Sequence, residues 1–153
     1  MNRVVPIALA ALAFAALASV LYVRMAPMRP ADWHRDPMGA DRTGRPNDYL
    51  VGPAGDREAV VVDELPEALL ARLDAVALAE PRTTRLAGSP AEGWVSYLQR
   101  SVVVGFPDVV NVRADPEGSG SQLVVWSRSR FGQSDFGVNK ARVDRWLAML
   151  GVT

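Results

Sequence analysis

The sequence predicts an α+β fold: a two-layer sandwich in which two helices cover one face of an antiparallel sheet, preceded by one N-terminal transmembrane helix. Three observations support this prediction. A long uncharged apolar run begins the chain, short β-branched runs separated by Gly and Pro residues follow it, and amphipathic segments accompany those runs. Short connections favour antiparallel neighbours, and helices are needed to cover the apolar face of such a sheet.

The apolar run predicts a membrane anchor over residues 1–24. Residues 4–23 carry no charge, and a helix rising ~1.5 Å per residue over that length matches the bilayer hydrocarbon core of about 30 Å. The alternative is a cleaved secretory signal, because Arg3 gives a basic start and the small residues before Ser19 fit a cleavage site. We favour the uncleaved anchor, because the apolar run continues past Ser19 and brings Tyr22 to the expected interface.

The orientation of this helix is weakly encoded. Arg3 precedes the span, whereas Arg24, Arg29 and Arg35 follow it, and this count slightly favours a cytoplasmic domain. The signal-like start and the very short N-terminal tail favour export. We choose the exported orientation.

Residues 25–55 are rich in Pro and Gly and show no sustained periodicity. This composition predicts an extended tether or a meandering loop. Trp33 and Tyr49 argue against complete disorder, so we expect residues 45–53 to pack on the domain that follows. The globular domain is predicted to span residues 56–153.

The domain begins with a strand and a helix. Residues 59–63 form a short β-branched run typical of a strand. Pro66 then begins a helix, because proline is tolerated in the first turn. Leu69 and Leu73 recur at helical spacing in this helix, and Pro81 ends it.

Further strands and a last helix complete the predicted domain. Turn signals separate the strand candidates, which cover residues 83–87, 94–104, 109–114 and 122–130. The last helix spans residues 138–150, places Val143, Trp146 and Leu147 on one face and stops before Gly151. The predicted order is β-α-β-β-β-β-α.

Composition excludes several classes of chemistry. The 17 basic residues balance the 17 acidic ones, so no overall field favours nucleic acid. The chain has no Cys and one His, His34, which excludes disulfides, thiol catalysis, cysteine-based zinc sites and histidine triads. We expect no catalytic residues, no metal site and no cofactor.

A candidate site lies around the last predicted strand and the helix after it. Arg128 and Arg130 share one face of the strand, Ser134 or Asp135 lies where a helix cap forms, and Asn139 should face the sheet. Arginine forks beside a helix N-terminus suit a carboxylate, phosphate or sulfate. The sequence favours the alternative of a purely structural corner, since Asp135 already offers a counter-charge to either arginine.

Another polar pair is expected close to this segment. Arg100 and Asp108 flank the turn at residues 102–107, and we expect them to pair across it.

Two segments resemble a known family. Residues 105–108 (GFPD) and 127–143 (SRSRFGQSDFGVNKARV) are similar to the bacterial and plastid family called domain of unknown function 1499, and the similarity covers residues 45–150. The resemblance implies a preceding signal or membrane segment but no established activity. Many members carry Pro-Asn-Cys near the domain start, whereas this chain has Asp48 after Pro46 and Asn47.

The family pattern adds Arg142 to the candidate site. The predicted ligand-binding set, for a small anion, is therefore Arg128, Arg130, Ser134, Asp135, Asn139 and Arg142.

These observations favour a non-enzymatic, membrane-anchored module that binds a partner or serves as an accessory part of an inner-membrane assembly. The alternative is a binding domain for a small anionic or amphipathic ligand, and the least favoured interpretation is a hydrolase or isomerase. We expect a single-pass protein of the bacterial inner membrane whose globular domain lies in the periplasm, with an inner-membrane protein partner and no nucleic acid.

Overall fold

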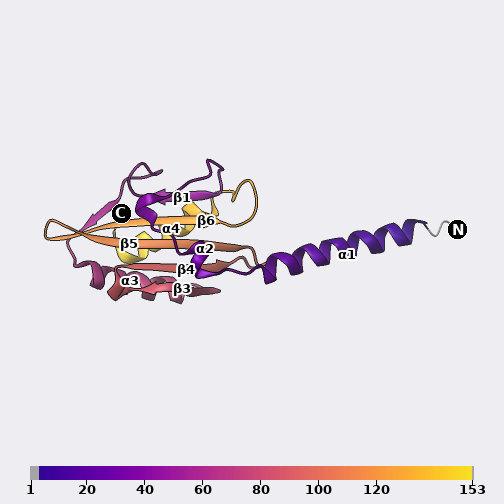
Figure 1. Ribbon diagram of the computed structural model, residues 1–153, viewed down its shortest axis with the longest axis horizontal. Helices are drawn as coiled ribbons and strands as arrows, with labels where there is room; N and C mark the ends of the chain where they lie inside the picture. Colours follow the sequence, from indigo (N-terminus) through magenta and orange to yellow (C-terminus); the bar gives the residue numbers. More distant parts are fainter. Residues whose placement is uncertain (1–3, 153) are drawn as a thin grey trace.

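An antiparallel sheet of six strands forms the centre of the molecule, and one long helix projects from its end (Figure 1). The computed structural model describes residues 4–152. The strand order is β1-β6-β5-β4-β3, and β2 also pairs with β6. The strands are β1 (Asp48–Val51), β2 (Val60–Val62), β3 (Thr83–Ser89), β4 (Trp94–Arg100), β5 (Pro107–Glu117) and β6 (Gly120–Ser129).

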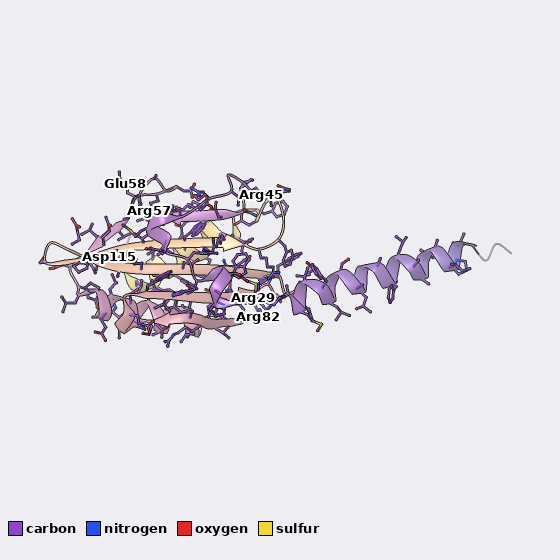
Figure 2. The ribbon with its side chains drawn as sticks, in the orientation of Figure 1. Arg29, Arg45, Arg57, Glu58, Arg82 and Asp115 are labelled. Carbon is purple, nitrogen blue, oxygen red and sulfur yellow. The ribbon has the colours of Figure 1, made fainter. Side chains whose placement is uncertain are left out.

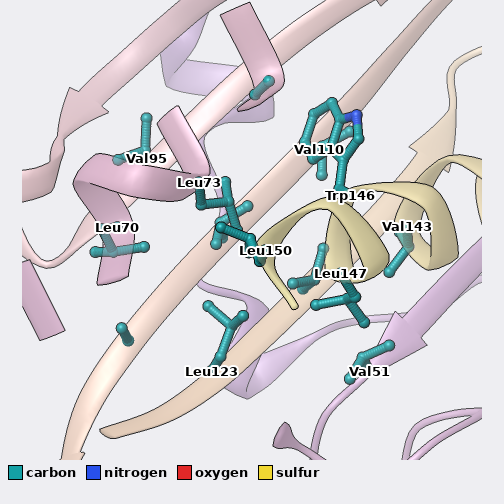
Figure 3. Close-up of a cluster of buried hydrophobic side chains, with 14 of the residues drawn as sticks. Val51, Leu70, Leu73, Val95, Val110, Leu123, Val143, Trp146, Leu147 and Leu150 are labelled. Carbon is teal, nitrogen blue, oxygen red and sulfur yellow. The ribbon is translucent and has the colours of Figure 1, made fainter. Parts of the chain in front are cut away.

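Two helices cover one face of the sheet, as predicted. They are α3 (Pro66–Ala79) and α4 (Val138–Leu150). Their apolar residues pack with those of the strands in one buried cluster, to which Leu70 and Leu73 of α3 and Trp146 of α4 contribute (Figure 3). Truncating a buried leucine typically costs about 2–5 kcal/mol, so this cluster is the main source of stability. The α+β sandwich expected from the sequence is confirmed.

The opposite face of the sheet is covered by residues 26–45, here called the juxtamembrane segment. It contains a short helix, α2 (Pro30–Trp33), and a 3₁₀ turn, η1 (Pro37–Gly39). Asn111 Nδ2 donates to the Trp33 carbonyl over 3.0 Å, and Arg113 pairs with Asp36 over 2.5 Å. These contacts come from residues that alternate along β5 with the apolar ones facing α3 and α4. Much of the predicted tether therefore lies against the sheet.

Helix α1 (Val4–Met25) leaves the domain beside the β4–β5 loop, at the end opposite the β5–β6 hairpin (Figure 1). It is long and apolar enough to cross a membrane, and none of its apolar window is buried against the protein. Signal sequences share these properties. Arg3, used above to weigh orientation, lies outside the described residues.

Two differences between the observed and predicted strands go beyond a shift of one to three residues at a strand end. Asp48–Val51 pairs with β6 and forms β1, a strand that the sequence pattern does not predict. Strand β4 ends at Arg100 and not at residue 104. The reason for the second difference is a local turn, in which the Ser101 hydroxyl accepts hydrogen bonds from the backbone N–H groups of Gly105 and Phe106.

Candidate functional site

The sheet separates two of the six predicted ligand-binding residues, the strand arginines, from the two that belong to the last helix. Arg128 and Arg130 point toward the juxtamembrane segment: the Arg128 guanidinium lies 5.1 Å from the centre of the Trp33 ring, and Arg130 donates to the Pro27 carbonyl. Asn139 and Arg142 belong to α4, on the other face. The arginine pair therefore does not lie beside the N-terminus of α4.

Ser134 and Asp135 shape the turn before α4. The N-cap residue of α4 is Gly137, and the carboxylate of Asp135, two residues earlier, accepts from the N–H groups of Gly137 over 3.0 Å and Asn139 over 2.8 Å, so it satisfies one free N–H of the first helical turn. Ser134 Oγ accepts from the Phe136 N–H over 3.2 Å. Asp135 makes no ion pair with Arg128 or Arg130 within residues 4–152.

Arg142 is the centre of a buried polar network, which we define as Gln99, Asp108, Ser127, Asn139 and Arg142. Its guanidinium pairs with Asp108 Oδ2 over 2.8 Å, and the two side chains are only 4% and 9% exposed. It also donates to the side-chain oxygens of Gln99, Ser127 and Asn139. Four acceptors thus surround one buried cation.

Asn139 connects this network to the start of the domain. Its amide faces the sheet, as the helical spacing predicts, and donates to Ser129 Oγ over 3.0 Å and to the Asn47 carbonyl over 3.1 Å. Asn47 in turn donates to the Gly132 carbonyl over 2.9 Å. Asn139 therefore ties the turn to the sheet, which is one part of the structural-corner alternative.

The predicted pair of Arg100 and Asp108 is not formed. Asp108 is taken by Arg142, and Arg100 Nη1 donates instead to the Gly105 carbonyl over 3.1 Å. Gln99 and Ser127 were not among the predicted site residues. A polar residue at an inward strand position is the signal that marks both of them.

Arg128 occupies a second polar site, on the juxtamembrane face. Its guanidinium lies 3.9 Å from the centre of the Trp126 ring and donates to the Trp33 carbonyl over 3.1 Å. Its Nε is buried and has no hydrogen-bond partner within the described residues. Burial lowers the pKa of Arg128 to about 10, and the nearby charge of Arg35 acts in the same direction.

A small pocket of about 170 Å³ adjoins this guanidinium. It is lined by residues of the juxtamembrane segment, β1 and β6 and by residues next to these strands, among them Thr43, Arg45 and Arg130. Asp48 also lines it, but its carboxylate is bound by Arg42, over 2.8 and 2.9 Å, and by the Trp126 indole N–H over 2.9 Å. Asp48 thus joins the juxtamembrane segment to the sheet. It lies at the position where many members of the family that the sequence resembles have cysteine.

The part of the chain that the structure describes contains no cluster of metal-ligand side chains. No group of three or more His, Asp and Glu side chains there could hold an ion. His34 lies instead on Trp94, with ring centroids 3.9 Å apart, and its Nδ1 shares a 2.7 Å hydrogen bond with Ser96 Oγ.

Comparison with known sequences places these features in a family. No curated protein matches the chain. The sequence model of the family described as "Protein of unknown function (DUF1499)" matches residues 41–150, which include the strands β1–β6, both core helices and the buried polar network. The chain therefore belongs to the DUF1499 family.

Proposed function

We propose that this protein is a membrane-anchored, non-enzymatic module that holds its sheet domain at a fixed orientation as an accessory part of an inner-membrane assembly. The observation that carries the proposal is the juxtamembrane segment, which packs along the sheet and leaves little free chain between α1 and the domain. Its contacts with Asn111 and Arg113 of β5 and with Arg130, which follows β6, hold it against the face opposite α3 and α4. A module held in this way presents one defined surface to a neighbouring membrane protein.

The state of the polar residues supports a role without bond chemistry. The buried ion pair of Arg142 with Asp108 is accompanied by three further side-chain acceptors of the same guanidinium, on Gln99, Ser127 and Asn139. A general acid or base must reach a substrate within hydrogen-bond distance. Groups already engaged in internal hydrogen bonds are better suited to stabilising the fold behind a binding surface than to acid or base catalysis.

The anchor and its orientation can be tested together. Intact mass measurement on protein purified from membranes should give the full chain, whereas a mature protein beginning near Ser19 would remove the anchor from the proposal. Because the chain has no Cys, a Glu58→Cys variant offers a single thiol. A membrane-impermeant maleimide should label it in cells with a permeabilised outer membrane but an intact inner membrane, and a Leu12→Cys control within α1 should stay unlabelled.

The partner is tested by extracting the protein in gentle detergent. We expect it to migrate in a native complex heavier than its monomer. Recovery of the monomer alone, over several detergents and after cross-linking in cells, would contradict an accessory role.

A second candidate function is the binding of a small anion at Arg128. The buried Nε without an acceptor favours it, because an unpaired buried donor costs free energy that an anionic oxygen would recover. Arg130 and Thr43 line the same pocket and could add donors. This site uses the two predicted strand arginines but not the other predicted residues, which are Ser134, Asp135, Asn139 and Arg142.

Titration calorimetry on the full chain in detergent tests the anion site with inorganic phosphate and sulfate. We expect binding that Arg128→Gln abolishes and that Arg57→Gln, a change outside the pocket, leaves intact. Equal heats in both variants would remove the site.

A further inference from the structure

The end of the domain from which α1 emerges carries exposed apolar side chains on two loops. The loop at residues 101–106 exposes Val102 by 71% and Val103 by 80%, and the loop at residues 130–137 exposes Phe136 by 95%. Apolar side chains gathered at one end of a domain mark a contact with a membrane or another molecule.

Contacts with the last turn of α1 fix where the first loop lies along the helix. Arg24 Nε donates to the Val104 carbonyl over 3.0 Å, and its Nη2 donates to the Val103 carbonyl over 2.8 Å. Gly105 lets this arginine approach, because a Cβ at residue 105 would lie 2.9 Å from Arg24 Cγ. The loop and Arg24 therefore lie at the same level along the axis of α1.

Aromatic rings connect the second loop to the same turn of α1. The Tyr22 and Phe131 rings meet edge to face with centroids 6.0 Å apart, and Phe106 lies 6.3 Å from Phe131. A pocket of about 520 Å³ lies between the two loops and is lined by Phe106, Phe131 and Phe136. Aromatic residues at this position are typical of a membrane–water interface.

The uncharged part of α1 sets the height of the bilayer. Residues 4–23 carry no charge and Arg24 is the first charge after them, so the hydrocarbon core ends near residue 23 and Arg24 lies among the headgroups. Loops bound to Arg24 and Tyr22 then lie at the surface of the same bilayer.

Charge complements this placement. Arg24, Arg82 and Arg100 line a pocket of about 510 Å³ next to Val102, and Figure 2 shows Arg29 and Arg82 beside the base of α1. Guanidinium groups bind phosphate oxygens through paired N–H donors. At the height of Arg24, the phosphates available are those of the lipids.

We propose that the loops at residues 101–106 and 130–137 insert into the interfacial layer of the bilayer that α1 crosses. Val102, Val103 and Phe136 lie below the lipid phosphates, and Arg82 and Arg100 lie against them. The proposal rests on α1 being retained as an anchor. The surface that the two loops contact is that of the phospholipid bilayer. The domain would then contact the membrane at three places: α1 and the two loops.

Spin labels measure the depth of each loop directly. The cysteine-free chain allows single-cysteine variants of the full-length protein in nanodiscs of phosphatidylethanolamine and phosphatidylglycerol. Val103→Cys and Phe136→Cys report on the loops, and Glu58→Cys, at the end far from α1 (Figure 2), is the matched exposed control. Collision rates with oxygen, which dissolves in lipid, and with a water-soluble nickel complex give the depth.

The proposal gives opposite results for loops and control. Labels at residues 103 and 136 should collide more with oxygen than with nickel and lie about 5–10 Å into the bilayer boundary, as interfacial elements do. The label at residue 58 should collide mainly with nickel. Nickel-dominated collisions at 103 and 136, or shielding from both reagents by a contact between copies, would overturn the proposal.

A fourth label separates this result from the fate of the anchor. Leu12→Cys lies within α1, where oxygen should dominate if the helix spans the bilayer. If the label at residue 12 collides mainly with oxygen while the labels at residues 103 and 136 collide mainly with nickel, the loops do not insert but α1 still spans the bilayer. Nickel dominance at all of these positions sinks the anchor as well.

Discussion

At the scale of single residues, the buried polar network is the place where one substitution can leave a buried charge without its partner. Arg142 and Asp108 are paired away from water, and the guanidinium also donates to Gln99, Ser127 and Asn139. Removing one partner of such a pair leaves an uncompensated buried charge, which is far more costly than losing an exposed pair.

We predict that Asp108→Asn lowers the free energy of unfolding by about 3 kcal/mol, as expected when a buried pair loses one partner. Urea denaturation in detergent micelles measures it. Asp32→Asn, which breaks the exposed pair with Arg29, is the matched control and should cost less than about 1 kcal/mol. Equal costs for both variants would show that the Arg142 pair contributes no more than a surface pair.

His34 gives a prediction about pH. Burial lowers its pKa below 6.5, and Glu92 opposes this only in part. The unfolded chain therefore binds a proton at a higher pH than the folded chain does, so the contribution of His34 to stability is present above pH 6.5 and is lost as the pH falls through the folded pKa. As the chain has one His, its NMR signal can be titrated without overlap.

The expected titration midpoint lies below 6.5, and the unfolding midpoint should fall over the same interval. His34→Gln should remove that dependence. A midpoint above 6.5 would mean that protonation strengthens the contact with Trp94 and Ser96.

At the scale of elements, the β4–β5 loop and the end of α1 depend on one glycine. Gly105 has φ +83°, in the left-handed region, and its missing Cβ leaves room for the Arg24 side chain. Ser101 closes the same loop by accepting from the N–H groups of Gly105 and Phe106. Residue 105 therefore meets two requirements: a left-handed backbone and room for the side chain of Arg24.

Gly105→Ala should cost more stability than Gly44→Ala. Gly44 has φ +73°, but a Cβ added there would meet no atom within 4 Å, so its substitution measures the backbone strain alone, about 1–2 kcal/mol. At residue 105 the displacement of Arg24 adds to that strain. Chemical unfolding of both variants gives the difference, and a smaller loss for Gly105→Ala would show that Arg24 moves aside freely.

At the scale of the whole molecule, the juxtamembrane segment decides how the domain sits relative to α1. Trp33 is one of its attachments, because Asn111 and Arg128 both donate to its carbonyl and its ring faces the Arg128 guanidinium. A segment attached in this way transmits the orientation of α1 to the sheet.

Distance measurements between spin labels test this rigid connection. With labels at Leu12→Cys and Glu58→Cys, pulsed electron resonance should give one narrow distance distribution in nanodiscs. Adding Trp33→Ala should broaden it, because the cation–π contact, worth about 0.5–2 kcal/mol, is lost. Met38→Ala, on the same segment but exposed, is the control. A broad distribution before any substitution would indicate a free tether.

Much of this architecture could be predicted from local pattern. The spacing of Leu69 and Leu73 predicts α3, the face of Val143 and Trp146 predicts α4, and β-branched runs predict the long strands. Strand β1 was not predicted because Asp48–Val51 is short and lies among Pro and Gly residues; its pairing with β6 supplies the hydrogen bonds that define it. The position of the arginines on one strand face was predicted, but not which layer covers that face.

By itself, the sequence determined the properties that depend on neighbouring residues: an uncharged span long enough for a bilayer, helices with one apolar face, alternation along β6 and a chain without thiols. Only the tertiary structure decided which polar groups meet. Asp108 and Arg142 are 34 residues apart, and Trp33 and Arg128 are 95 apart. Such pairings depend on how the layers pack on the sheet. A buried charge needs a partner that lies close to it in space, and separation along the chain does not show which residue that is.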